Sequence, residues 1–255
     1  MKKACLFLLV LVLPWAGKAT DVDSTAIRAG MLDGQLRLAR QQQDTLATAR
    51  ALAALGTFHL FETKNDARVL SLARQLLAVA TPTHDYLHLA RAYEWLAILT
   101  FHQKTTNPAP LFNRAVAYAR RANNWQVLTE VCQSSADVAI HYKNYARAEE
   151  LLGQAMTACR THDPDTWFMA GLDYCALLQT QHRAGAAQAL ARQLDQMRPR
   201  LRKTNGPFVY ANDMARLATY LGHYQEAETL LLTGMATEQA RPHPTHCTST
   251  IITRT

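Results

Sequence analysis

Two histidines four residues apart form the pattern in this sequence that comes closest to a metal site. His84 and His88 enclose the pentad HDYLH. On a helix, two imidazoles at this spacing lie on one face, and metalloproteases hold zinc in this way beside a glutamate base. Asp85 stands where that glutamate would be needed, and no third ligand lies nearby in the sequence. We keep a metal-dependent hydrolase as an alternative and favour a second interpretation, in which Thr83 and Asp85 cap the start of a helix.

Other catalytic patterns are missing from the sequence. It has no glycine-rich phosphate loop and no Gly-x-Ser-x-Gly turn. His243, His246 and Cys247 lie in a stretch rich in proline and threonine, which offers no preformed metal site. We therefore expect a protein that is not an enzyme and that has no catalytic, cofactor-binding or metal-binding residues.

Three further cysteines, Cys132, Cys159 and Cys175, fall on the apolar faces of predicted helices. A free thiol in such a place packs like a small hydrophobic group. Buried thiols are therefore the favoured interpretation. If one disulfide forms, we expect it to join Cys159 to Cys175, because one short turn separates their helices.

The first nineteen residues, MKKACLFLLVLVLPWAGKA, have the composition of a secretory signal peptide. Two lysines precede an apolar run from Leu6 to Leu13, which is far shorter than the roughly 20 residues that cross a bilayer. Gly17 and Ala19 are small residues at the positions that determine cleavage. We expect cleavage after Ala19 and a periplasmic or secreted mature protein with no membrane span.

The charge balance gives little reason to expect a nucleic-acid partner. Lysine and arginine exceed aspartate and glutamate by 27 to 20 in the whole chain, and by 24 to 20 without Lys2, Lys3 and Lys18 of the predicted signal peptide. This excess is spread along the sequence except at residues 198–203, so it does not form the basic surface that nucleic acids require.

The elements that must position any site are helices, and their pattern repeats. One helix is predicted from Ser24 or Thr25 to about Gln43, within an N-terminal capping segment at residues 20–43. Short turns rich in asparagine, proline and glycine then divide residues 44–240 into antiparallel helix pairs. Residues 241–255 have no helical period and are predicted to be a disordered tail. The first helices of five pairs begin near Asp44, Thr83, Asn124, Asp165 and Pro207, a period of about forty residues.

Small residues recur inside these pairs at fixed intervals of 12 and 7 residues. They are Ala136, Ala148 and Ala155 in one pair and Ala215, Ala227 and Gly234 in another. Small side chains let two helices approach closely, and one hairpin can bury its apolar flank only against the next. The sequence therefore predicts an all-α repeat protein.

The residues of these pairs resemble tetratricopeptide repeats (TPRs). Leu52-x-x-Leu55-Gly56 and Tyr93-x-x-Leu96-Ala97 match the first helix of that family, and Gly222-His-Tyr224-x-x-Ala227 matches the start of its second helix. The second motif recurs with lysine for glycine as Lys143-Asn-Tyr145-x-x-Ala148. The resemblance implies a TPR-like right-handed α-solenoid of about five antiparallel helix pairs plus the capping helix. The period near forty is similar to that of extracytoplasmic TPR sensor portions of bacterial signalling proteins.

The fourth pair allows two alignments. Trp167-x-x-Ala170-Gly171-x-x-Tyr174 matches the letters of the family best, whereas Leu172-x-x-Cys175-Ala176 keeps the forty-residue phase. We prefer the phase, which places Ala176 in the position of Ala136 and Ala215, because spacing reflects how hairpins stack.

In TPR proteins the first helices line a concave groove, so the resemblance implies a scaffold that binds a protein or peptide there. The acidic middle of this groove argues against the family's lysine and asparagine clamp for a C-terminal carboxylate. Charges on an exposed helix face are otherwise ordinary solvated side chains. Counted from the small residue of each first helix, the groove residues are Arg91, Glu94, Glu130, Gln133, Asp137, Asp173, Gln181, Asn212, Arg216 and Tyr220.

A second hypothesis concerns the end of the repeats. Leu230, Leu231 and Leu232 are followed directly by the predicted tail, so the apolar side of the last hairpin is poorly covered. This favours either a homodimer through the C-terminal repeat or a shortened form of a longer signalling protein, in which case the chain is a self-association module.

Overall fold

The structure is a computed structural model that describes residues 18–104, 106–202 and 206–239. Every regular element in these ranges is helical, as predicted. The predicted signal peptide, apart from its last two residues, and the predicted tail lie outside them. None of the helices described is both long enough and apolar enough to cross a membrane.

One N-terminal helix and five hairpins make up this part of the chain. Helix α1 (Lys18–Gln41) begins earlier and ends two residues sooner than the sequence predicted. The observed first helices start within three residues of the five predicted starts. The hairpins are α2 (Thr45–Phe58) with α3 (Asp66–Ala80), α4 (Tyr86–Gln103) with α5 (Ala109–Arg121), α6 (Trp125–His141) with α7 (Tyr145–Cys159), α8 (Pro164–Thr180) with α9 (Ala184–Asp195), and α10 (Pro207–Leu221) with α11 (Tyr224–Gln239). A π-helical turn (His59–Thr63) extends α2, and a short 3-10 turn (Arg198–Arg200) follows α9.

Side chains cap six of the helix starts in the described part of the chain. The side chains of Asp44, Asn65, Asp85, Asn124, Asn144 and Asp163 each accept a hydrogen bond from a backbone N–H of the helix that follows. The residue before the cap is often in the left-handed region, where glycine is the unstrained choice. Lys143 has φ 58° and Gly222 has φ 87°, which confirms that the two turns are equivalent despite their different residues.

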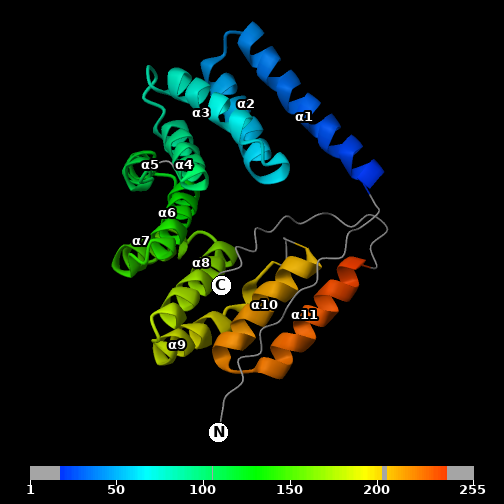
Figure 1. Ribbon diagram of the computed structural model, residues 1–255, viewed down its shortest axis with the longest axis vertical. Helices are drawn as coiled ribbons and strands as arrows, with labels where there is room; N and C mark the ends of the chain where they lie inside the picture. Colours follow the sequence, from blue (N-terminus) through cyan, green and yellow to red (C-terminus); the bar gives the residue numbers. More distant parts are fainter. Residues whose placement is uncertain (1–17, 105, 203–205, 240–255) are drawn as a thin grey trace.

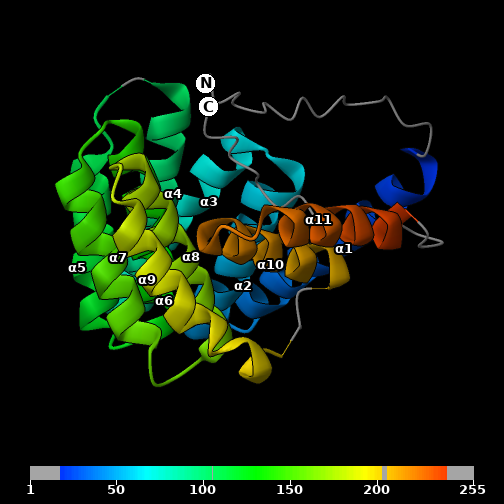
Figure 2. The same cartoon turned by 90° about the horizontal axis from the view of Figure 1, so that it is seen from below.

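The hairpins follow one another along an open curve (Figure 1). Helices α4, α6 and α8 lie nearer its inner side, and α5, α7 and α9 lie outside them. Each first helix contacts the first helices of neighbouring hairpins, so α2, α4, α6, α8 and α10 form one continuous inner layer. Helices α1 and α11 are the two ends of the curve and lie on the side of the molecule opposite α5 and α7 (Figures 1 and 2).

The small residues of the repeat lie where they were predicted, between the two helices of a hairpin. Ala136, Ala148 and Ala155 are completely buried. A Cβ atom on Gly234 would stand 2.7 Å from the Cβ atom of Ala211, closer than real Cβ atoms approach. The close approach of α10 and α11 therefore depends on glycine at this position.

The fourth hairpin corrects the predicted phase by one residue. The left-handed residues Lys143, His182 and Gly222 mark equivalent turns, and the residue seven positions before His182 is Cys175. The Cys175 Sγ atom lies 3.5 Å from the carbonyl oxygen of Ala187, twelve residues later. Cys175 therefore occupies the position that was predicted for Ala176, because the turn after α8 comes one residue earlier than a strict forty-residue period requires.

The third small position of this hairpin is filled by a large residue. Leu194 is buried seven residues after Ala187, where the third and fifth hairpins have Ala155 and Gly234. Gly171 faces it, and a Cβ atom added to this glycine would lie 2.5 Å from Leu194 Cδ2. The large side chain on α9 is thus accommodated by the absence of one on α8.

The three cysteines in the described part of the chain are free thiols and are buried. Cys159 donates a hydrogen bond to the carbonyl oxygen of Ala155 at 3.1 Å. Burial raises the pKa of Cys132 and of Cys175 to about 12, so both thiols remain protonated and unreactive.

Candidate functional site

Two sets of polar contacts that share α6 join the inner helices α4, α6, α8 and α10, and we call them together the inner ladder. It begins between α4 and α6. Arg91 forms an ion pair with Glu94 on its own helix at 3.1 Å and a second one with Glu130 on α6. The Ser134 Oγ atom donates a hydrogen bond to Glu94 Oε1 at 2.9 Å. Two side chains of α4 are therefore held from the neighbouring hairpin.

The inner ladder continues from α6 through α8 to α10. Gln133 Nε2 donates to Asp173 Oδ2 at 3.0 Å, and Arg216 Nη2 donates to Asp173 Oδ1 at 2.8 Å. Asp213 lies 3.9 Å from Arg216, and Tyr220 also contacts this arginine. The partners that join different helices are 39, 40 or 43 residues apart in sequence, so the ladder follows the repeat period.

Two carboxyl groups of the ladder have raised pKa values. Burial raises the pKa of Glu94, and the Glu130 carboxylate raises it further, although Arg91 acts in the opposite direction. Burial likewise raises the pKa of Asp213 to about 6 against the attraction of Arg216. Both acids are held where water does not solvate their charge.

The two arginines of the ladder also have raised pKa values. Burial alone would lower the pKa of Arg91 and of Arg216, but the neighbouring carboxylates outweigh it and raise both values. These two side chains are committed to ion pairs within the protein. They are 22% and 29% exposed, respectively, and are not free to capture a ligand.

The structure brings together most of the residues that were predicted to line the groove. Arg91, Glu94, Glu130, Gln133, Asp173, Arg216 and Tyr220 all belong to the inner ladder. Gln181 does not, because its Oε1 atom accepts a hydrogen bond at 2.9 Å from Arg183, whose other partner, Glu149, lies on α7. Asn212 lies on α10, half-buried and without a hydrogen-bond partner in the described ranges, and Asp137 lies half-buried on α6.

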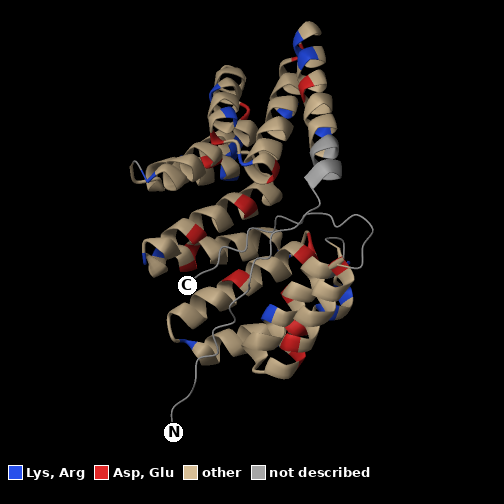
Figure 3. Cartoon of the chain, turned by 45° about the vertical axis from the view of Figure 1, so that its right-hand side comes forward, with Lys and Arg blue, Asp and Glu red and all other residues tan. Residues whose placement is uncertain are grey.

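Two members of the ladder, Ser134 and Asp213, were not among the predicted groove residues. Both could have been found from the period, because Ser134 follows Glu94 by forty residues and Asp213 follows Asp173 by forty. The side chain of the ladder that water reaches most is Glu130, which is 50% exposed. Figure 3 shows basic and acidic residues distributed along the helices of the described ranges.

The histidine pentad does not form the arrangement that its spacing suggested. His84 has φ 51° and lies in the turn before α4, so it does not share a helical face with His88. His88 is buried, and its Nδ1 atom lies 2.6 Å from Asp85 Oδ2. Asp85 also caps the helix, as the second interpretation predicted. In the ranges that the structure covers, no group of three or more histidine, cysteine, aspartate or glutamate side chains is placed to hold a metal.

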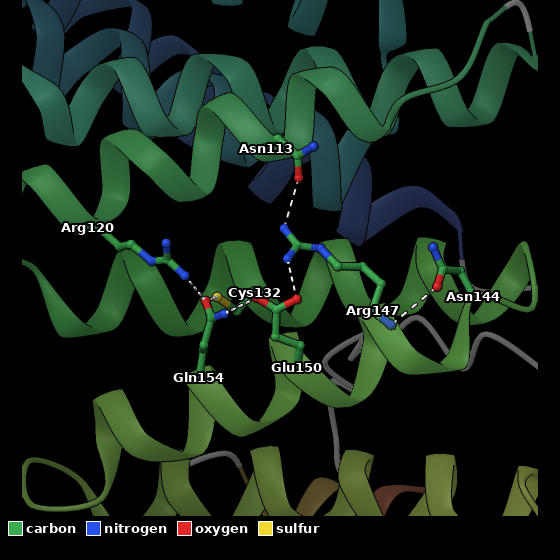
Figure 4. Close-up of polar contacts among 7 residues, drawn as sticks. All are labelled: Asn113, Arg120, Cys132, Asn144, Arg147, Glu150 and Gln154. Atoms are coloured by element: carbon green, nitrogen blue, oxygen red, sulfur yellow. Dashed lines mark hydrogen bonds and ion pairs between the residues drawn. The ribbon is translucent and has the colours of Figure 1, made fainter.

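A second set of polar contacts lies on the outer helices (Figure 4). Arg120 on α5 donates to Gln154 on α7 at 2.6 Å, and Arg147 on α7 donates to Asn113 on α5 at 2.9 Å. Both pairs are 34 residues apart. Arg147 also pairs with Glu150, whose side chain is 53% exposed. Inner and outer contacts together hold successive hairpins side by side.

Comparison with solved structures agrees with this architecture. No protein-family model matches the sequence, and no curated protein sequence matches it either. The crystal structure of BtubC (BKLC) from P. vanneervenii superposes with a TM-score of 0.66 at 15% identity, over 87% of this chain and 95% of that one. The chain is a TPR-like helical repeat protein. A putative kinesin light chain from Podosopora anserina with nearly identical TPR-like repeats also matches, at 15% identity and a TM-score of 0.41, over 82% of this chain and 95% of that one.

Proposed function

We propose that this TPR-like chain is a scaffold that binds a protein or peptide along the inner ladder. The fold is that of protein-interaction scaffolds, which in general are not enzymes. The observation that carries the proposal is the inner layer of five helices, whose polar side chains form two sets of contacts that share α6 and together extend from α4 to α10. Such a surface offers several hydrogen-bonding groups in a row to an extended or helical segment.

The partner that fits this surface carries positive charge. The inner ladder contains four carboxyl groups and two arginines, and both arginines are paired. Glu130 is the carboxylate that water reaches most, so it is the group that a lysine or arginine of the partner would meet first. A negatively charged segment would meet an excess of like charge.

Binding of synthetic peptides tests this function. A lysine-rich peptide should bind the wild-type protein, bind roughly tenfold more weakly to the Glu130→Gln variant, and weaken as salt is added. Glu150→Gln is the matched control, because Glu150 is 53% exposed and also pairs with an arginine but lies on the outer helix α7. Equal binding of an acidic peptide of the same length, or equal loss in both variants, would refute the proposal.

We also propose that the protein is exported and takes part in a bacterial signalling system. The proposal is supported by the composition of residues 1–19 and by the resemblance of the period near forty to extracytoplasmic TPR sensor portions. Amino-terminal sequencing of the protein from cell fractions tests it. The expected result is a periplasmic or secreted chain beginning at Thr20, and an intact chain in the cytoplasm would contradict it.

Self-association is a second candidate function. It is favoured by the last helix, α11, on which Tyr224, Leu232 and Met235 are 70%, 60% and 43% exposed. A homodimer through the C-terminal repeat is the simplest form, and a shortened version of a longer protein would leave the same surface uncovered. Light scattering of the purified chain distinguishes association from a strict monomer.

A further inference from the structure

Both end helices of the stack carry an uncovered apolar stripe. On α1, Ile27, Met31 and Leu38 are 65%, 63% and 53% exposed. Their spacing of 4 and 7 residues places them on one narrow side of the helix, opposite the buried Leu36 and Ala39. On α11, the second stripe consists of Tyr224, Leu232 and Met235. We call these the α1 stripe and the α11 stripe.

Inside the stack, the equivalent surfaces are covered. Each of α3, α5, α7 and α9, the second helices of the first four hairpins, packs against the first helix of the next hairpin. Helix α11 is also a second helix, but no hairpin follows it in the described part of the chain. No first helix therefore covers the α11 stripe among the described residues.

Helix α1 also occupies the place of a second helix. Arg40 on α1 donates to Gln75 on α3 at 2.6 Å across 35 residues, and Arg120 on α5 donates to Gln154 on α7 at 2.6 Å across 34 residues. The same kind of contact thus joins α1 to α3 and α5 to α7. The α1 stripe is left open because no first helix precedes α1 among the residues that the structure describes.

We propose that copies of this chain associate head to tail, with the α11 stripe of one copy packed against the α1 stripe of the next. The proposal gives a geometry to the second candidate function, self-association, and does not depend on peptide binding at the inner ladder. Each copy covers the open end of its neighbour through a contact between two helices, α11 and α1, that both occupy the place of a second helix.

Charge favours this pairing over a symmetric one through α11. The charged residues of α11 are all acidic, whereas the end of α1 carries Arg37 and Arg40. Two α11 stripes would bring like charges together. Arg37 and Glu228 are exposed and have no ion-pair partner in the described part of the chain, so each is available to the other across the contact.

A head-to-tail contact has a distinct consequence for size. Because the two surfaces differ, every open assembly still presents one free α1 stripe at one end and one free α11 stripe at the other, and it grows until it closes into a ring. A symmetric contact through α11 would stop at a dimer. Light scattering over a range of protein concentrations should therefore show a mass that rises beyond that of a dimer.

Mixing two blocked variants tests the pairing directly. Met31→Asp places a short carboxylate in the α1 stripe, and Leu232→Asp does the same in the α11 stripe. Each variant alone should be a monomer, and an equimolar mixture should form a dimer that does not grow, because one intact stripe of each kind remains. Tyr142→Asp is the control, since Tyr142 is 53% exposed but lies in the turn after α6, and this variant should assemble like the wild type.

Three results would overturn the proposal. They are a wild-type chain that stays monomeric at about 0.5 mM, a Met31→Asp variant that still forms a dimer alone, and a mixture that remains monomeric although both variants keep the helical circular dichroism of the wild type. Exchanging the charges of Arg37 and Glu228 provides an independent test of the contact. Arg37→Glu should weaken assembly at least about tenfold, and adding Glu228→Arg to the same chain should restore it.

Discussion

Removing the Arg91 side chain should destabilise the protein strongly, because it leaves a buried carboxylate without its cation. Glu94 is 4% exposed, and its only other hydrogen-bond partner among the described residues is Ser134. Breaking a buried pair by removal of one partner costs about 3 to 5 kcal/mol. Arg91 is 22% exposed, so water can partly replace it, and we expect the Arg91→Leu substitution to cost about 3 kcal/mol of unfolding free energy.

Arg147→Leu is the matched control. Arg147 and Glu150 are also three residues apart on one helix and form an ion pair at 2.6 Å, but Glu150 is 53% exposed. An exposed pair contributes about 1 kcal/mol or less. Urea unfolding followed by far-ultraviolet circular dichroism measures both variants under the same conditions.

A second substitution separates loss of the cation from loss of packing. If the unpaired Glu94 carboxylate causes the damage, the double variant Arg91→Leu/Glu94→Gln should recover most of the lost stability, because glutamine can still accept the hydrogen bond from Ser134. The loss of unfolding free energy caused by Arg91→Leu should also be smaller at pH 5 than at pH 7, because the unpaired Glu94 is protonated more readily at the lower pH. Equal costs for Arg91→Leu and Arg147→Leu, or no recovery in the double variant, would refute the reasoning.

Three further predictions concern other parts of the fold. The pKa of Asp213 rises from 3.8 to about 6, so its contribution to stability is present below pH 3.8 and is lost as the pH rises to about 6. The unfolding free energy of the wild type should therefore fall as the pH rises from 4 to 7. This fall should exceed that of the Asp213→Asn variant by up to about 3 kcal/mol. Parallel pH profiles of the two proteins would contradict this. Lys143→Gly should stabilise the protein by about 1 kcal/mol in thermal unfolding, because Lys143 has φ 58°, whereas Gly222→Lys should destabilise it, and changes of the same sign would be inconsistent with equivalent turns. Gly171→Ala should cost about 1 to 3 kcal/mol in urea unfolding, and less than half of that when Leu194→Ala makes room for the added Cβ atom; an unchanged cost would show that the two side chains do not meet.

The helices and their turns were predictable because local chemistry determines them. Asp85 and Asn144 can cap only a helix that follows them, and the left-handed turn at Lys143 repeats the one at Gly222. The apolar period then shows that each hairpin needs a neighbour. The capping and turn signals each lie within a few residues, and the period repeats along the chain, so one sequence contains both kinds of signal.

The contacts between hairpins were less predictable, because they depend on how far one helix is shifted along the next. The groove residues were expected to face a ligand, but Arg91 and Arg216 are used within the protein. The one-residue shift that places Cys175 beside Ala187 follows from the length of the turn after α8. Gly171 on α8 faces Leu194 on α9, so the small residue lies on one helix and the large residue on the other. A pattern sought in each helix separately does not reveal such a pair.

Hairpins about forty residues apart stack through their inner helices. A double-mutant cycle between Asp173 on α8 and Arg216 on α10 tests it most directly, with unfolding free energies measured for Asp173→Asn, Arg216→Leu and the double variant. The atoms lie 2.8 Å apart, so we predict a coupling free energy of about 1 kcal/mol or more, and none between Asp173 and Arg91. A coupling between Asp173 and Arg216 that is within about 0.3 kcal/mol of zero would contradict the stacked arrangement.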